Sequence, residues 1–304
     1  MLTADYHYED LHWLDTAVAE IAAAVERDTF PHALLIHGPY GTGRRQLAKQ
    51  VAELVLGNKL DDNDQHANLY EVCPIDDKQI KVDQIRALIE FMQLTSHGHG
   101  SKIAAIYPAD RMTDNAANSL LKTLEEPPGK SMLIIVAENL ASLPPTVISR
   151  CQQLRVAAPA HADGVTWLTQ HDSAENWGGI LEFCGNAPLY ALELQQQGFI
   201  DKARGYAADL NALQQGRADP VAIAKQWAKD DVSLCLRWLY SQAAKVMRQQ
   251  SGARNATQST EACYVYLREL LQLRRSVKSG LNMELNLAHV LYAWYGGFTG
   301  LPQD

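Results

Sequence analysis

A glycine-rich segment, GPYGTGRR at residues 38–45, has the spacing of a phosphate-binding loop. Gly38 and Gly43 match both glycines of the frame GxxxxGK[ST], in which a lysine reaches the terminal phosphates and a hydroxyl holds magnesium. Here the lysine position is Arg44, and the hydroxyl position is Arg45, which offers no oxygen. Because arginine is bulkier and forked, the exchange is not conservative in a tight phosphate cradle. The alternative is a glycine-rich turn with no nucleotide-binding history.

The acidic residues of a P-loop ATPase, which hold magnesium and position water at the end of a neighbouring buried strand, are also missing. That strand is expected to end in the sequence KIAAIYPADRM, so Tyr107 and Pro108 occupy the acidic positions. Neither residue binds a metal or acts as a base, and Asp110 lies nearby but out of register. Two independent parts of one catalytic site are therefore absent, which argues against a working ATPase.

Neither cysteine nor histidine spacing indicates a metal site. His97 and His99 flank a glycine in an expected loop, and no HxxxH or HExxH pattern occurs. The cysteines never form a CxxC pair, so we expect no disulfide framework, no zinc knuckle and no bound cofactor. Most of them are expected to be small buried apolar residues: Cys73, Cys151, Cys184, Cys235 and Cys263.

Strands and helices must alternate to position these groups. Short apolar runs predict strands, and apolar residues at helical spacing predict the helices between them. The order implies an α/β fold with a mostly parallel sheet covered on both faces. Thr113 and Asp114 are expected to cap a helix, although an exposed helix start can also meet a phosphate. The expected strands are 33–36, 69–72, 103–106, 132–136 and a segment near 154–156; the expected helices are 14–25, 47–55, 82–92 and 114–124.

The pattern becomes helical almost throughout after Pro159. Breaks are expected at Gly178–Gly179, 186–188, 216–220 and Ser251–Gly252. We therefore predict three domains, at 1–158, 159–204 and 205–304. Late aromatic residues could stack on bases, but their helical spacing among leucines and alanines favours a packed core or a subunit interface: Trp227, Trp238, Tyr240, Tyr264, Tyr266 and Trp294.

Composition limits the classes of function. The 304 residues, 47% of them hydrophobic, are enough for a sizeable core. A net charge of −8 argues against a chain that coats nucleic acid alone. No apolar run approaches the roughly 20 residues of a membrane span, and the first residues lack the pattern of a signal peptide. We therefore expect a cytoplasmic protein with no membrane partner.

Two motifs lie within residues 113–151, namely LLKTLEEPP at 120–128 and Ser-Arg-Cys at 149–151. A helix that ends in the first motif, followed by a strand and then the second motif, resembles the clamp-loader branch of the AAA+ family at every one of these positions. The segment FPHALLIHGPYGTGRRQLA is also similar to that branch, so the resemblance covers roughly the first half of the chain. It implies an AAA+ sheet domain, a small helical lid domain and a helical collar domain that holds a ring of subunits together.

The resemblance also implies two further losses. ATPases of the family carry a nucleotide-sensing arginine near residues 185–188, where this chain has Pro188 or Leu189. Many bacterial members hold a four-cysteine zinc module after the P-loop helix, whereas this chain has only the polar stretch Lys59–Asn68 there. Cys73 stands alone, so we expect no structural zinc.

In such rings a subunit donates an arginine to the ATP bound by its neighbour, where it stabilises charge on the transferring phosphoryl group. The resemblance assigns this role to Arg150, between its motif neighbours Ser149 and Cys151. The alternative is a surface arginine in an ordinary salt bridge. Cys151 is expected to be a packed residue, and the carboxylates of Glu125 and Glu126 to fix a turn or face a neighbouring subunit.

Three functions are open from the sequence. The first is a non-catalytic clamp-loader subunit of a bacterial DNA polymerase III, with gamma/tau and delta subunits, the beta sliding clamp and primed DNA as partners through the complex. The second is a divergent AAA+ ATPase that binds or slowly hydrolyses ATP with Arg44 in place of lysine. The third is an interaction module on an inactive P-loop scaffold outside replication.

Overall fold

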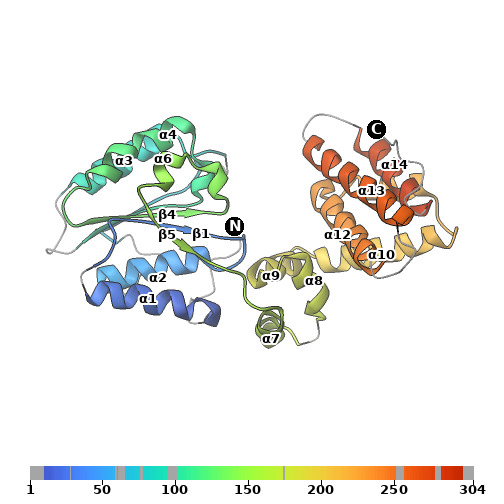
Figure 1. The fold of residues 1–304 in the computed structure, drawn as a ribbon, viewed down its shortest axis with the longest axis horizontal. Helices are drawn as coiled ribbons and strands as arrows, with labels where there is room; N and C mark the ends of the chain where they lie inside the picture. The colour runs from blue at the N-terminus through green and yellow to red at the C-terminus, as the bar shows by residue number, and fades with distance from the viewer. Residues whose placement is uncertain are drawn as a thin grey trace. The chain divides into compact units, whose positions relative to one another are not determined.

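The computed structural model describes residues 10–27, 29–58, 60, 66–75, 78–94, 101–173, 175–250, 257–277 and 282–296. The chain divides into two compact units, Met1–Glu193 and Leu194–Asp304, and each is described by itself. The first unit contains a sheet with helices, and the described part of the second contains helices (Figure 1). The three-domain division stays a prediction.

The sheet of the first unit has five strands in the order β2-β3-β4-β1-β5, and every pair is parallel. Parallel strands are covered on both faces and are therefore apolar along their length, as β4 shows with all seven residues buried. The expected α/β fold is confirmed. The strands are β1 (Ala33–His37), β2 (Leu69–Val72), β3 (Lys102–Ile106), β4 (Ser131–Ala137) and β5 (Gln152–Arg155).

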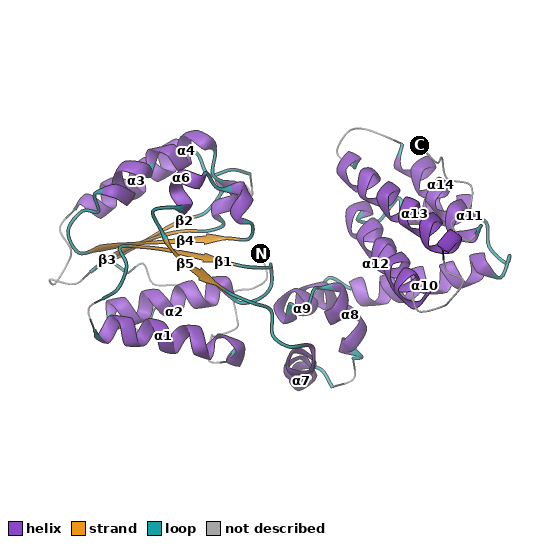
Figure 2. Cartoon of the chain, in the orientation of Figure 1, coloured by secondary structure: helices purple, strands orange, loops and turns teal. Residues whose placement is uncertain are grey.

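Helices cover both faces of this sheet. Figure 2 shows α1 and α2 on one face and α3, α4 and α6 on the other. Leu35, Ile106 and Ile135 of the strands pack with Leu88 of α3 and Leu120 in one buried apolar cluster. The helices of this unit are α1 (Asp15–Glu26), α2 (Arg44–Leu56), α3 (Val82–Gln93), α4 (Asp114–Ser119), α5 (Leu121–Glu125), α6 (Pro145–Ile148), α7 (His161–His171), α8 (Trp177–Phe183) and most of α9 (Pro188–Gln196).

The second unit packs its helices around buried aromatic side chains. The rings of Tyr206 and Trp227 lie 4.5 Å apart, and those of Trp227 and Trp238 lie 6.3 Å apart. Tyr266 and Trp294 are buried as well, so the expectation of a packed core is confirmed for these late aromatics, whereas Tyr264 is 64% exposed. The helices are α10 (Phe199–Gln214), α11 (Pro220–Trp227), α12 (Val232–Gln250), α13 (Thr257–Ser276) and α14 (Met283–Tyr295).

Two local predictions need correction. Gly178–Gly179 do not break a helix, because they lie in the first turn of α8, where backbone N–H groups have no partner within the helix in any case. The single helix expected at 114–124 is divided into α4 and α5 at Leu120. The predicted break at Ser251–Gly252 and most of the predicted loop 59–68 lie outside the described residues. Among the described helices, none combines the length and apolar character that a membrane span needs.

Candidate functional site

The glycine-rich loop joins the carboxyl end of β1 to the start of α2. Gly41 and Gly43 have φ values of 77° and 92°, a left-handed backbone that glycine adopts without steric cost. A Cβ atom on Gly41 would lie 2.5 Å from the backbone nitrogen of Tyr190, and one on Gly43 would lie 2.9 Å from a methyl group of Leu11. Both glycines therefore allow other parts of the same chain to approach the loop closely.

Protein groups bind the carbonyl and side-chain oxygens of this loop. The backbone N–H of Leu189 donates to the Gly41 carbonyl at 3.1 Å. The indole Nε1 of Trp13 donates to the Thr42 carbonyl at 2.9 Å. The hydroxyl of Tyr40 donates to the Glu193 carboxylate at 2.8 Å, and burial together with this carboxylate raises the pKa of Tyr40, so the hydroxyl keeps its proton at neutral pH. The loop is thus fastened to α9 and to the segment before α1.

The two arginines of the loop have different surroundings. Arg44, at the lysine position, is only 5% exposed, and its Nη1 is buried with no hydrogen-bond partner. Burial lowers the pKa of Arg44, while the Glu138 carboxylate opposes that shift. Arg45 is exposed and lies over the ring of Tyr107, 5.6 Å from its centroid. Neither side chain supplies an oxygen ligand for magnesium.

The strand end that should carry acidic residues carries none in the expected register. Tyr107 and Pro108 follow β3 directly, and burial raises the pKa of Tyr107. Asp110 lies further along and accepts hydrogen bonds from the backbone N–H groups of Glu138 and Asn139, at 2.7 and 2.8 Å. The carboxylate of Asp110 therefore fixes the turn after β4. At the sensor position, Pro188 and Leu189 begin α9, which leaves no arginine there.

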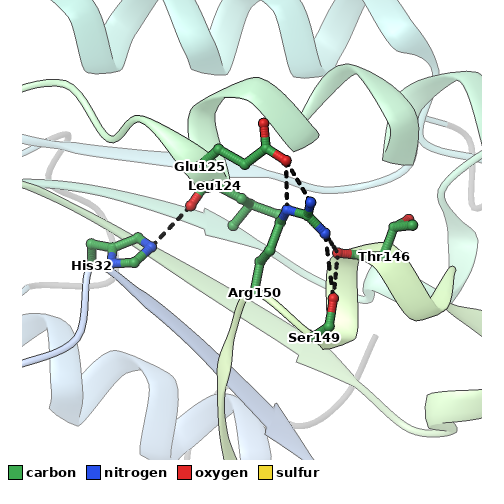
Figure 3. Close-up of polar contacts among 6 residues, drawn as sticks. All are labelled: His32, Leu124, Glu125, Thr146, Ser149 and Arg150. Atoms are coloured by element: carbon green, nitrogen blue, oxygen red, sulfur yellow. Dashed lines mark hydrogen bonds and ion pairs between the residues drawn. The ribbon is translucent and has the colours of Figure 1, made fainter.

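Arg150 follows the short helix α6 and precedes β5. Its Nε and Nη2 donate to one oxygen of Glu125 at 2.8 and 2.5 Å, and its Nη1 donates to the carbonyl of Thr146 at 3.0 Å (Figure 3). A longer contact of 3.4 Å joins Nη1 to the hydroxyl of Ser149. The side chain of Arg150 is 35% exposed. The arginine therefore lies at the surface in a salt bridge, as the alternative to the finger expects, and its role toward a neighbouring subunit stays a prediction.

Cys151 is half-buried against the apolar cluster of the first unit, as predicted. Burial raises the pKa of its thiol to about 11, so the thiol is protonated at neutral pH and is a poor nucleophile. Thr113 caps α4 as expected, because its hydroxyl accepts from the Ala116 N–H at 3.3 Å. His97 and His99 lie outside the described residues, and the described residues contain no cluster of potential metal ligands.

The register of the sheet separates Arg150 from the loop of its own chain. β5 runs parallel to β1, with Leu34 opposite Gln152 and His37 opposite Arg155. Arg150 precedes β5 and lies at the amino edge of the sheet, whereas the glycine-rich loop follows β1 at the carboxyl edge. At about 3.3 Å per residue, the length of β1 puts roughly 15 Å between the two edges. The structure does not bring these predicted site residues together.

Several residues around these two places were not found from the sequence. Tyr190, Glu193 and Trp13 fasten the loop, and His32 donates from Nε2 to the carbonyl of Leu124, beside Glu125, at 3.0 Å (Figure 3). His32 and Leu124 are 92 positions apart, so no local spacing signals their contact. Glu125 was singled out for its motif, but its bond to Arg150 required the folded chain.

Comparison with known proteins defines the class. A family model described as "DNA polymerase III, delta subunit" matches residues 13–160. A gamma subunit-related protein of DNA polymerase III from Thermotoga maritima has a similar structure, with a TM-score of 0.60 and 20% identity, and the match covers 92% of this chain and 99% of the other. The fold is therefore that of the clamp-loader branch of AAA+ proteins.

Two relatives sharpen this assignment. DNA polymerase III subunit delta' of Pseudomonas aeruginosa is 29% identical over 86% of this chain and 91% of its own length. The subunit delta' of Haemophilus influenzae is 32% identical over 64% of each chain. The chain is therefore similar to delta' subunits of DNA polymerase III over most of its length.

Proposed function

We propose that the chain is a non-catalytic clamp-loader subunit of DNA polymerase III that donates Arg150 to the ATP site of a neighbouring subunit. Its partners are gamma/tau and delta subunits, and through the complex it helps to load the beta sliding clamp onto primed DNA in the cytoplasm. The relatives support this proposal, since they are named as delta' subunits of DNA polymerase III.

The position of Arg150 at the amino edge of the sheet is the observation that carries the proposal. An arginine that stabilises phosphoryl transfer must touch the reacting phosphate. Arg150 lies on the opposite edge from the loop of its own chain and is partly exposed. A nucleotide at the loop of the same chain lies at the opposite edge from Arg150, which supports a role toward the ATP of a neighbouring subunit.

Arg150→Ala tests this role in a reconstituted loader. An arginine finger contributes about a thousandfold or more to the rate at its site, so the site that Arg150 serves should become almost inactive. We therefore expect the DNA-stimulated ATPase rate of the loader to lose the part that this one site contributes. The rate is measured by phosphate release with sliding clamp and primed DNA present. Arg86→Ala is the control, since the contact of Arg86 within the described residues is a highly exposed ion pair with Asp83 on α3. An Arg150→Ala loader with an unchanged rate would exclude the finger.

The alternative, a divergent ATPase, draws support from Arg44, which keeps a buried cation at the start of α2. We expect the isolated chain to show no magnesium-dependent ATP hydrolysis, because position 45 of the loop offers no hydroxyl ligand and β3 ends without an acidic pair. Phosphate release by purified chain is the measurement. Hydrolysis that disappears in Arg44→Ala would favour the alternative instead.

A further inference from the structure

The hydrogen bonds of Arg150 account for almost all of its donors. A guanidinium has five N–H donors. Glu125 accepts from Nε and Nη2, and Thr146 and Ser149 accept from Nη1. One N–H of Nη2 is left over from these bonds. Contact with a phosphoryl group through more than this single N–H therefore requires Arg150 to give up a bond within its own chain.

The bond to Glu125 is the one that an incoming phosphate competes with most directly. A carboxylate and a phosphate are both anions that bind guanidinium groups, so they are alternative partners for the same edge of Arg150. The side chains of Glu125 and Arg150 are 52% and 35% exposed. Exposed ion pairs of this kind are weak, so a phosphate with more than one negative charge can replace the carboxylate.

Glu125 is held in place at the end of α5. The imidazole Nε2 of His32 donates to the carbonyl of Leu124, the residue before it, at 3.0 Å. The backbone of His32 in turn accepts from the Leu133 N–H of β4 at 2.8 Å. The carboxylate is thus attached to the amino edge of the sheet, next to the arginine that it binds.

We propose that Glu125 holds Arg150 in a docked position and that the phosphate of the neighbouring subunit's ATP must displace this carboxylate before the arginine engages. Glu125 is then a positioning residue that sets the ATP concentration at which the finger acts. This inference rests on the proposed function of Arg150. It assigns to Glu125, the first glutamate of the LLKTLEEPP motif, a role that acts through Arg150.

Glu125→Gln in the reconstituted loader tests the docked position. Glutamine keeps the shape of the side chain but removes the competing charge. We expect the KM for ATP of the site served by Arg150 to fall by about two- to fivefold, the range that the strength of an exposed ion pair allows. The kcat at saturating ATP should stay unchanged, because saturating ATP displaces Glu125 in the wild-type loader as well.

Two further variants separate the possible outcomes. Glu126→Gln changes the neighbouring exposed glutamate and should leave KM and kcat as in the wild type. Arg150→Ala combined with Glu125→Gln should match Arg150→Ala alone, because Glu125 acts only through the arginine. If Arg150→Ala slows the loader but Glu125→Gln leaves KM unchanged or lowers kcat, the docking inference is wrong and the finger stands. If Arg150→Ala has no effect, the proposed function itself fails.

Discussion

Gly41 allows the start of α9 to pack closely against the glycine-rich loop. The frame of two outer glycines suggests a phosphate cradle, yet the Leu189 N–H donates to the Gly41 carbonyl and the Tyr190 backbone lies where a Cβ would be. The glycine is therefore retained for a contact within the protein. Gly57 provides a comparison, because it has a similar φ of 71° but no atom within 4 Å of the position of a Cβ. The effect of the close contact at Gly41 can therefore be separated from the effect of its backbone conformation.

Gly41→Ala should destabilise the chain more than Gly57→Ala does. Both changes place an alanine in a left-handed backbone, which costs about 1–2 kcal/mol. Only Gly41→Ala also forces a Cβ atom against Tyr190, and overpacking of this kind adds about 1–3 kcal/mol. Urea unfolding followed by circular dichroism measures both free energies. Equal losses in the two variants would show that the contact with Tyr190 is not tight.

At the same scale, the sequence identified Arg150 but not its partner. Arg150 is recognisable because it lies in a short motif at a fixed separation from another motif. Glu125 lies in that other motif, 25 positions away, and nothing in either motif says that the two side chains meet. The contact depends on how α5 and α6 end at the same edge of the sheet, which is a property of the packed chain.

Among the elements, one carboxylate links α10 to the segment that follows α11. Asp230 accepts from Lys202 at 2.6 Å and from the hydroxyl of Tyr206 at 2.7 Å. The hydrogen bond from Lys202 is the main cause that lowers the pKa of Asp230, and burial opposes it. Tyr206 also packs against Trp227, so the carboxylate joins a polar contact to the aromatic core of the second unit.

Asp230→Asn should lower the free energy of unfolding by about 1 kcal/mol at pH 7, because the contact is partly exposed and screened by solvent. The pKa of Asp230 is lower in the folded chain than its usual 3.8, so its contribution is present above pH 3.8 and is lost as the pH falls through the folded-state pKa. The difference between wild type and variant should therefore shrink below pH 3.8. Urea unfolding at pH 7 and pH 3 measures it.

Asp201→Asn provides the matched control for this experiment. Asp201 lies on the same helix, α10, and pairs with Arg204, but its side chain is 83% exposed. The variant should therefore unfold almost as the wild type does at both pH values. A loss as large as that of Asp230→Asn would mean that general charge effects, rather than the bonds to Lys202 and Tyr206, explain the result.

Most elements of the first unit are predictable from the sequence because buried parallel strands are continuous apolar runs. β4 is one such run, and the helices around it show apolar residues at regular spacing. The prediction was wrong at Gly178–Gly179, because glycine is tolerated in the first turn of a helix. It also treated α4 and α5 as one helix, since apolar spacing does not reveal a local break at Leu120.

In the molecule as a whole, the polarity of the sheet separates two kinds of site. A parallel sheet has one edge where all strands begin and one where all strands end. The glycine-rich loop lies at the edge where β1 ends, and Arg150 lies at the edge where β5 begins. Changes at one edge therefore need not disturb the other, which explains how an arginine can be kept while the residues for magnesium are absent.

The covering of the loop also has a consequence for its evolutionary history. Once Leu189, Trp13 and Glu193 had become partners of the loop, each of these contacts contributed to the folded state. A return of lysine at position 44 would not by itself restore a serine or threonine at position 45 or an acidic pair after β3. Reversal to an ATPase requires changes at position 45 and after β3 in addition to position 44, so no single substitution restores the residues that hold magnesium. The absence of these residues is therefore not reversed by single substitutions.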